Sequence, residues 1–474
     1  MTLLGIGKGP LASWTVTEML KELGFERALE EGKVKIAPDG VVSVGTFTGD
    51  VRTQEELEAM LRALGKVAKP VATSTTAGRA VKPMDVLLRA RASQVENRVN
   101  ERLWMGIQLQ TDLKPEYRHG QRFDLPLKRL PPGEGAVFTV GHKSAVVDAM
   151  RKLLVDKDGS VLVPVHPQEM QFREMTAADG TIPGVRCASS ERTVHAGVPG
   201  LPDVMLKLDL AHIMHSMVVR PIGKDAAYGA VKMTEFLMDW IDKNPKTDDA
   251  FCFFPEVMAV VDVKADAAAV VRGVQPYPPH PSGKTWTMPA YSLSARDQDF
   301  PNEPPPLIRM INDRPDPTVR PVDDFIARFV KPLVESALRV ALDLGSACQM
   351  HGQNSYLEMG PEGQPTGRVV HGDLEAFWPH PDVAQVTGRD DYFAKNGATF
   401  TPALESDISW TFQTYFVNGN LLPLVKCFEA AFPDQADEAR ALFKGVIKAG
   451  VEQRKDVVTA LKNGVMQGFA RYLT

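Results

Sequence analysis

A proline-heavy segment between residues 276 and 321 divides the chain into two parts with different hydrophobic periodicity. Proline cannot donate a backbone hydrogen bond, so the segment is predicted to be irregular. Before it, short runs of aliphatic and β-branched residues alternate with helical patterns. After it, the apolar residues recur almost entirely at helical spacing. The sequence therefore predicts an α+β fold with a mixed middle part and a helical C-terminal part.

The predicted elements follow from these patterns. Strands are expected over residues 41–47, 161–165, 204–210 and 257–263, and helices over 16–31, 53–67, 86–110, 144–155, 228–242, 322–349, 419–432, 435–448 and 452–473. A chain of 474 residues exceeds one ordinary hydrophobic core, which favours two or three folding units. Changes in composition put their boundaries near residues 67 and 300.

The composition is that of an ordinary globular protein, with 44% hydrophobic residues, 24% charged residues and a net charge of −5. This balance lacks the excess of basic residues that is typical of a nucleic-acid-binding protein. No apolar run reaches the roughly 18 to 20 residues that a membrane helix needs, and the first residues do not form a secretion signal. The four cysteines include no CxxC pair, so they are interpreted as reduced thiols. We expect a cytoplasmic protein without nucleic-acid or membrane partners.

The sequence His351-Gly-Gln353-Asn354 follows a predicted helix and precedes the strand-like segment 355–359. One interpretation is a simple turn with a glycine at the helix C-terminus. The other is a ligand-binding site, because Asp373 comes just after a second strand-like segment, 368–371. A hairpin of these two strands would bring Asp373 beside His351 and Asn354, which favours the site.

Three polar groups lie upstream. Ser190-Glu-Arg192-Thr193 is either a polar turn or a phosphate-binding loop. Lys207 lies in an alternating strand, which is either an edge strand with a solvated face or part of a site. Ser216 and Arg220 are four residues apart, so in a helix they would share one face.

These residue types are suited to one kind of ligand. Hydroxyls, guanidinium groups and an ammonium group hold the oxygens of a polyphosphate. Histidine, asparagine and carboxylate side chains orient such a ligand and its metal ion. The sequence therefore predicts an enzyme that uses a nucleotide.

The same motifs resemble those of the NRPS-independent siderophore synthetases, the aerobactin-synthetase-like family. The family pattern is an S-x-R-T loop, a strand lysine, a T-x-x-x-R helix, an E-x-H-G-Q-N element and a later R-D pair. Here the corresponding residues occur in that order, and the resemblance extends over residues 68–474. They are Ser190, Arg192, Thr193, Lys207, Ser216, Arg220, His351, Gln353, Asn354 and Asp373.

Three positions depart from the family pattern. Gln349 stands where the family has a glutamate, and Gly372 stands where it has an arginine. The upstream G-H-P-x-H-P element is replaced by Gly78-Arg79-Ala-Val-Lys82-Pro83, which exchanges two histidines for two cations. Two cations can still bind a polycarboxylate, but neither is a base near neutral pH.

The resemblance implies a cupped-hand architecture with a short N-terminal thumb (residues 1–67), mixed α/β fingers (68–300) and a helical palm (301–474). It also implies that ATP activates a carboxylic acid as an acyl-adenylate, which then reacts with an amine or alcohol. Family members are commonly dimers. Citrate is the usual acid of the family, and the altered element at residues 78–83 weakens that expectation for this chain.

The resemblance implies a role for each matched residue. The implied catalytic residues are Arg192, Lys207, His351 and Arg220. The implied ATP-binding residues are Ser190, Arg192, Thr193, Lys207, Ser216, His351, Gln353, Asn354 and Asp373. The implied magnesium ligands are Asp373, Asn354 and Gln349, and the residues implied to bind the acid are Arg220, Arg79 and Lys82.

Two rival interpretations remain open. His371-Gly-Asp373-Leu resembles the catalytic loop of aminoglycoside and choline kinases, although Trp378 stands where those enzymes bind magnesium through asparagine. Alternatively, the altered residues make the chain a non-catalytic member of the family that binds a polycarboxylate or a protein partner.

Overall fold

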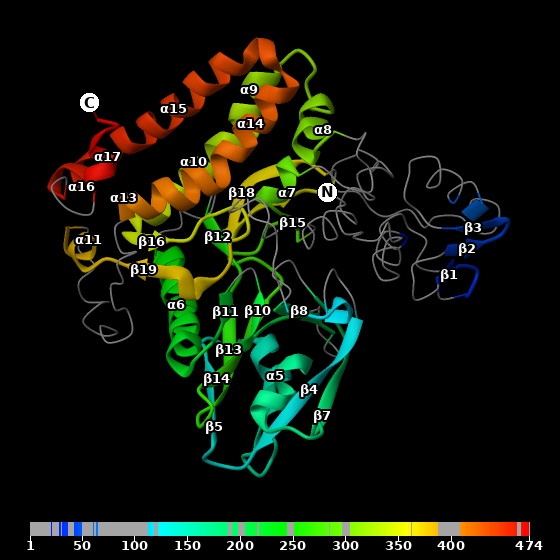
Figure 1. Ribbon diagram of the computed structural model, residues 1–474. Helices are drawn as coiled ribbons and strands as arrows, with labels where there is room; N and C mark the ends of the chain where they lie inside the picture. Colours follow the sequence, from blue (N-terminus) through cyan, green and yellow to red (C-terminus); the bar gives the residue numbers. More distant parts are fainter. Residues whose placement is uncertain are drawn as a thin grey trace.

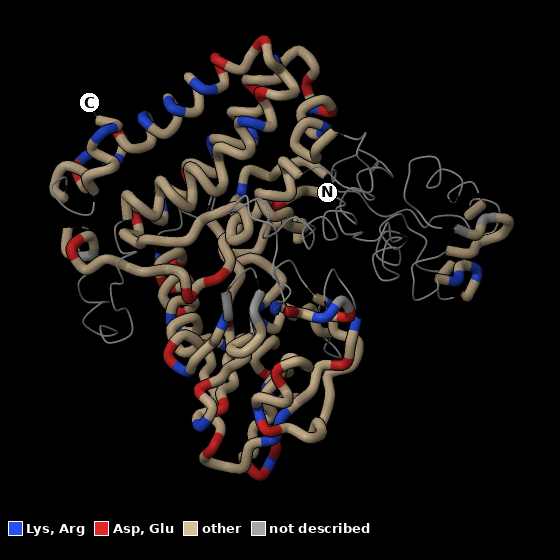
Figure 2. Tube along the Cα trace, in the orientation of Figure 1, with Lys and Arg blue, Asp and Glu red and all other residues tan. Residues whose placement is uncertain are grey.

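The computed structural model describes most of the chain beyond residue 111 and small parts before it. The described residues are 20, 28–29, 31–36, 42–49, 60, 63–64, 112–117, 122–187, 192–197, 204–215, 218–243, 251–283, 285–295, 304–361, 363–386, 408–461 and 466–473. Among them, no helix is both long and apolar enough to cross a membrane. Figure 2 shows that the positions of basic and acidic residues are interspersed along this part of the chain.

An eight-stranded antiparallel sheet forms the lower half of the molecule in Figure 1, in the order β5-β13-β14-β9-β8-β7-β4-β6. Its strands are β4 (Arg122–Leu130), β5 (Gly135–Thr139), β6 (Val161–Pro164), β7 (Gly180–Cys187), β8 (Thr193–Ala196), β9 (Val204–Leu208), β13 (Glu256–Asp262) and β14 (Ala267–Gly273). The central strands β9, β13 and β14 are buried along their whole length, which explains why most of their residues are apolar.

Two helices pack on this sheet. Helix α5 (Ala145–Leu154) begins at Ser144, whose hydroxyl accepts a hydrogen bond from the Val147 N–H. Its buried residues recur at helical spacing, as do those of α6 (Lys224–Lys243), which contacts β13 and β14. The amphipathic spacing of both helices therefore fixes the face that covers the sheet.

A second sheet of four strands lies between the first sheet and the C-terminal helices (Figure 1). Its order is β12-β18-β17-β15, with β12 (Phe251–Phe253) parallel to β18 (Pro365–His371) and the others antiparallel. The remaining two strands are β15 (Trp286–Pro289) and β17 (Ser355–Met359). Strands that precede and follow the proline-heavy segment are thus joined in one sheet.

Three small sheets complete the described strands. They are β1 (Lys35–Ile36), β2 (Val42–Val44) and β3 (Phe47–Gly49); β10 (Leu210–His215) with β11 (Val218–Arg220); and β16 (Ser346–Cys348) with β19 (Phe377–Pro379).

The C-terminal part is mainly helical. Its helices are α7 (Ala290–Ser294), α8 (Pro306–Asn312), α9 (Pro321–Phe325), α10 (Lys331–Leu338), α11 (Pro381–Val386), α13 (Ile408–Thr411), α14 (Leu422–Ala431), α15 (Ala436–Glu452), α16 (Lys455–Ala460) and α17 (Gln467–Ala470). Three π-helical stretches also lie in this part: η4 (Ile326–Val330), η5 (Arg339–Asp343) and η8 (Phe412–Leu421). It also contains the short 3-10 turns η6 (Leu374–Ala376) and η9 (Pro433–Gln435), while η1 (Pro115–Tyr117) and η2 (Pro167–Arg173) lie earlier in the chain.

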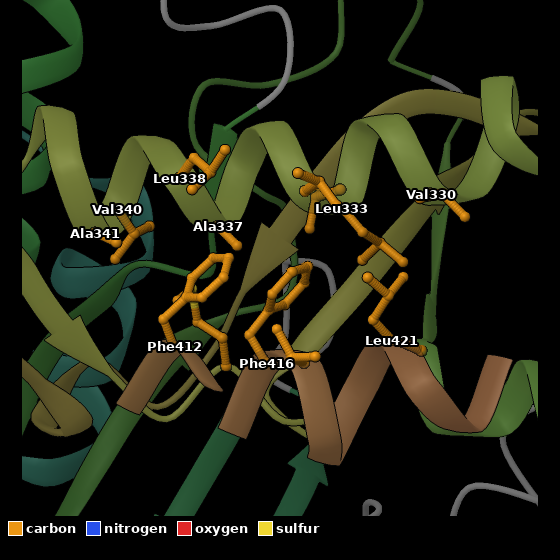
Figure 3. Close-up of a cluster of buried hydrophobic side chains, with 14 of the residues drawn as sticks. Val330, Leu333, Ala337, Leu338, Val340, Ala341, Phe412, Phe416 and Leu421 are labelled. Atoms are coloured by element: carbon orange, nitrogen blue, oxygen red, sulfur yellow. The ribbon is translucent and has the colours of Figure 1, made fainter. Parts of the chain in front are cut away.

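The helix pair α10 and η8 forms the centre of the C-terminal core, as Figure 3 shows. Phe412 and Phe416 of η8 project toward Leu333 and Ala337 of α10, and all four side chains are buried. Burying one such large apolar side chain contributes about 1.5–3 kcal/mol. This packing holds η8 against α10.

The α+β class predicted from the sequence is confirmed. The strands expected at 161–165, 204–210 and 257–263 correspond to β6, β9 and β13, and the helices expected at 144–155 and 228–242 correspond to α5 and α6. The helices expected at 16–31 and 53–67 fall mostly outside the described residues, and the one at 86–110 falls there entirely.

Two helix predictions are wrong in extent. The helix expected over 322–349 ends at Asp343, because Gly345 takes a positive φ of 73° and β16 follows. The helix expected over 452–473 is replaced by the end of α15 and by α16 and α17. In both places the apolar spacing continues past the point where the backbone changes conformation.

Candidate functional site

The HGQN segment, residues 351–354, forms a loop between β16 and β17. The predicted hairpin is confirmed: β17 pairs with β18 in antiparallel register, with Ser355 opposite His371. The N–H of Gly372 donates to the carbonyl of Asn354 at 2.8 Å. Asp373 therefore begins a loop immediately beside the end of the HGQN segment.

Close packing holds the HGQN loop in place. The Gly352 N–H donates to the Gly419 carbonyl of η8, and the Gly352 carbonyl accepts from the N–H of Tyr291 in α7, both at 3.2 Å. A Cβ atom at Gly352 would lie 2.8 Å from the backbone nitrogen of Tyr291. The glycine is required by this approach and does not cap the preceding helix, which has already ended.

His351 and Asn354 are both buried within this loop. The Nδ1 atom of His351 accepts a hydrogen bond from the Gln353 N–H at 3.3 Å, and its ring meets that of Tyr415 edge-on. The Nδ2 atom of Asn354 donates to the backbone carbonyl of Gln349 at 3.2 Å. Both side chains are therefore fixed by the loop that contains them.

The upstream cations lie on two neighbouring strands of the large sheet. Thr193 of β8 is opposite Lys207 of β9, and the Leu208 N–H donates to the Arg192 carbonyl at 2.9 Å. β9 lies between β14 and β8, so the edge-strand interpretation is wrong. Only 3% of the Lys207 side chain is exposed, which requires a compensating negative charge nearby.

Two carboxylates of the loop that follows β18 supply this negative charge. Lys207 forms an ion pair with Asp373, and its Nζ atom lies 2.7 Å from Oε1 of Glu375. Arg192 also approaches Oε1 of Glu375, at 3.6 Å. The cations of the large sheet and the loop after the HGQN hairpin thus form one cluster.

The charge state of Asp373 follows from this cluster. Burial raises the pKa of its carboxyl, but the charges of Lys207, Arg192 and Arg272 outweigh burial and lower the pKa well below its usual range. Asp373 also adopts a left-handed backbone conformation, with φ of 65°, which is uncommon for a residue other than glycine. The loop therefore presents an ionised carboxylate to the cations.

Three residues of this cluster were not predicted from the sequence. Arg272 of β14 lies 3.6 Å from Oδ1 of Asp373, and it forms a buried ion pair of 2.6 Å with Glu256 of β13. Glu375 is the third. For Arg272 and Glu256 the available signal was a charged residue near one end of a buried, mainly apolar strand, since a charge in a buried strand needs a partner.

Arg220 differs from its predicted setting. It lies in β11, which pairs with β10, so the predicted helix containing Ser216 and Arg220 is wrong. The β-branched Val218 and Val219 favour a strand at this position. The Arg220 backbone carbonyl accepts a hydrogen bond from Nη1 of Arg192 at 3.2 Å, which keeps Arg220 next to the cation cluster.

Four predicted residues, Ser190, Ser216, Arg79 and Lys82, lie outside the described part of the chain. Within the described part, no three histidine, cysteine or carboxylate residues are grouped as ligands of a metal ion. The side chains that the structure brings together are therefore those of Arg192, Lys207, Arg272, Asp373 and Glu375, beside the HGQN loop.

Comparison with solved structures identifies the fold. The chain is similar to the petrobactin biosynthesis protein AsbB from Bacillus anthracis, with a TM-score of 0.57 and 12% identity over 89% of this chain and 79% of that one. It is similar to ATP-bound aerobactin synthetase IucA from Klebsiella pneumoniae, with a TM-score of 0.56 and 13% identity over 92% and 87%. It is also similar to aerobactin synthetase IucC from the same organism. The TM-score is 0.57 and the identity is 15%, over 95% of this chain and 91% of that one.

These likenesses confirm, at the level of the fold, the resemblance that the motifs predicted. A family model described as "Ferric iron reductase FhuF-like transporter" matches residues 323–462, which include most of the C-terminal helices. A search of the curated proteins gives no significant match.

Proposed function

From this shared fold and from the charge cluster, we propose that the protein is an ATP-dependent ligase that joins a carboxylic acid to an amine or alcohol. The observation that carries the proposal is the meeting of Arg192, Lys207 and Asp373 beside the HGQN loop. ATP in the similar aerobactin synthetase IucA supports a nucleotide as the ligand. Synthesis of a siderophore or a related product is the corresponding pathway class.

The proposed reaction has two steps. A carboxylate oxygen of the acid attacks the α-phosphorus of ATP, and the bond to the bridging oxygen of the β-phosphate breaks to release pyrophosphate. The amine or alcohol then attacks the acyl carbon, AMP leaves, and the nucleophile loses its proton. Negative charge grows on pyrophosphate in the first step, where fixed cations are most effective.

Each residue has a role in this proposal. Arg192, Lys207 and His351 stabilise the charge on the polyphosphate, while Ser190, Thr193, Ser216, Gln353 and Asn354 hold the nucleotide. Arg220 holds the attacking carboxylate, a bidentate task suited to guanidinium. Arg79 and Lys82 hold the remaining carboxylates of the acid. Holding two anions together is mainly positioning, which can contribute about 7–11 kcal/mol.

Magnesium usually binds proteins through one or two carboxylates together with the phosphates of the substrate. Asp373 has an ionised carboxylate, and we propose that it holds the ion together with the side-chain oxygens of Asn354 and Gln349. The ion would offset phosphate charge when it is bound. Asp373 itself orients Lys207 through their ion pair.

We also propose the cupped-hand division into residues 1–67, 68–300 and 301–474, and a homodimeric, cytoplasmic protein. The small-molecule co-substrates are one acid and one amine or alcohol.

The test is an analysis of nucleotide products. The protein is incubated with ATP, Mg²⁺, hydroxylamine and a series of di- and tricarboxylic acids. AMP and pyrophosphate that depend on one acid, together with its hydroxamate, are the expected result. ADP would instead support the kinase interpretation through His371-Gly-Asp373. ATP binding without turnover, for every acid, would support a non-catalytic member of the family.

A further inference from the structure

Glu375 contacts the two cations that the proposed nucleotide requires. Its Oε1 atom lies 2.7 Å from Nζ of Lys207 and 3.6 Å from Nη2 of Arg192. We propose that Glu375 occupies the anion position in the ligand-free protein and leaves it when a polyphosphate binds. This inference rests on the proposed nucleotide site and adds a residue that sets which anions can enter it.

Burial gives the cluster an inner and an outer layer. The side chains of Lys207 and Arg192 are 3% and 8% exposed, whereas those of Asp373 and Glu375 are 20% and 21% exposed. The side chains of the two carboxylates are therefore the more exposed partners in the cluster. An anion that binds the two cations has to displace a carboxylate, because the oxygens of Asp373 and Glu375 already contact them.

Glu375 is more easily displaced than Asp373. Asp373 lies near three cations, and its backbone is fixed because the Ala376 N–H donates to its carbonyl at 2.9 Å. Glu375 uses one oxygen for both of its cations. Its other oxygen is buried and accepts no hydrogen bond from any described residue. An unsatisfied buried oxygen makes the ligand-free position of Glu375 less favourable than a fully bonded one.

The charges of the cluster explain the expected selectivity. Among the described residues, the cations Arg192, Lys207 and Arg272 face the carboxylates Asp373, Glu375 and Glu256, so the charges of these six side chains sum to zero. A single phosphate gives Lys207 and Arg192 few charged oxygen contacts beyond those that Glu375 already provides. A polyphosphate has several charged oxygens and can replace Glu375 at both cations. Return of Glu375 after the first step would favour the release of pyrophosphate.

The experiment is a titration calorimetry series with pyrophosphate, ATP and inorganic phosphate. The proteins are the wild type, Glu375→Gln, and the control Glu429→Gln, which makes the same change in the ion pair that Glu429 of α14 forms with Arg440 of α15. Glu375→Gln removes the competing charge while keeping the shape. This variant is expected to lower the Kd for pyrophosphate and for ATP about three- to tenfold. The ratio of the Kd for phosphate to the Kd for pyrophosphate is expected to be smaller than in the wild type.

Each outcome decides a separate point. Unchanged or weaker pyrophosphate binding by Glu375→Gln overturns the inference, and ATP binding by the wild type would then leave the proposed function standing. Tighter pyrophosphate binding without any ATP binding supports the competing role and overturns the nucleotide proposal. Glu375→Asp keeps the charge with a shorter reach and is expected to give a smaller gain. This second variant tests the inference if Glu375→Gln does not fold.

Discussion

Lys207 and Asp373 are 166 residues apart in the sequence and form an ion pair. The pair joins the large sheet to the loop that follows the β17–β18 hairpin. Together with the contacts of Glu375 and Arg272, it places the cations of the large sheet beside the HGQN loop, so the candidate site depends on both sheets.

Removal of the Lys207 charge is expected to destabilise the fold. In Lys207→Met, Asp373 and Glu375 lose their principal cation while they remain partly buried. The free energy of unfolding should fall by about 3–5 kcal/mol, as is typical when one partner of a buried ion pair is removed. Denaturant unfolding measures this change. The double variant Lys207→Met with Asp373→Asn should recover part of the loss, and equal stability of the single variant and the wild type would contradict the role of the pair.

Gly352→Ala is expected to disturb the HGQN loop. The new methyl group would lie 2.8 Å from the Tyr291 backbone, which cannot move as a flexible side chain would. A loss of about 1–3 kcal/mol in unfolding free energy and a clear loss of ligase activity should follow. Gly445→Ala in α15 is the control, because a Cβ atom there has no neighbour within 4 Å. It should stabilise the helix by up to about 1 kcal/mol.

Arg192→Ala and His351→Ala are expected to lower kcat/KM by about two orders of magnitude or more. The reason is the loss of groups that stabilise charge on the polyphosphate. Steady-state assays of pyrophosphate release measure the effect, and circular dichroism spectra of both variants should remain like that of the wild type. Wild-type turnover in both variants would refute the site.

The ion pairs of Arg454, which lies between α15 and α16, predict a pH effect on stability. Arg454 lies 2.7 Å from Glu335 and 2.8 Å from Asp343. Burial raises the pKa of Glu335, but hydrogen bonds and charges of Arg454 and Arg339 outweigh it and lower the pKa below the ordinary value of 4.5. A lowered carboxyl pKa stabilises the fold above the unfolded pKa, and this contribution disappears as the pH falls through the folded pKa.

Glu335→Gln should therefore be less stable than the wild type at neutral pH, by about 1 kcal/mol for a partly exposed pair. The difference should shrink below pH 4.5. Thermal unfolding between pH 3 and pH 7 checks this range. A difference that grows as the pH falls would contradict the assignment.

The sequence predicts the hairpin that carries Asp373 because two strand-like segments flank a short polar turn. Local pattern also predicts α5 and α6, where capping and apolar spacing agree. Burial of Lys207 could not be predicted in the same way, because alternation fits an edge strand and a central strand equally well. The neighbours of β9 in the sheet are β8 and β14, and the residues that determine this pairing are spread along the chain.

Arg220 and Glu375 show the same limit. A spacing of four residues fits a helix, but the pairing of β10 with β11 determines the conformation of Arg220. Glu375 carries no motif of its own, and its importance comes from two cations that lie far away in the sequence. Such contacts between distant segments have no local signature.

The parallel pairing of β12 with β18 has a consequence for fragments of this protein. A fragment that begins at residue 304 would keep β17 and β18 but lose β12 and β15, the strands on either side of them. The hairpin would then have two open edges with unpaired backbone groups, which are templates for intermolecular strand addition. The helical half of the chain is therefore expected to aggregate when it is expressed alone.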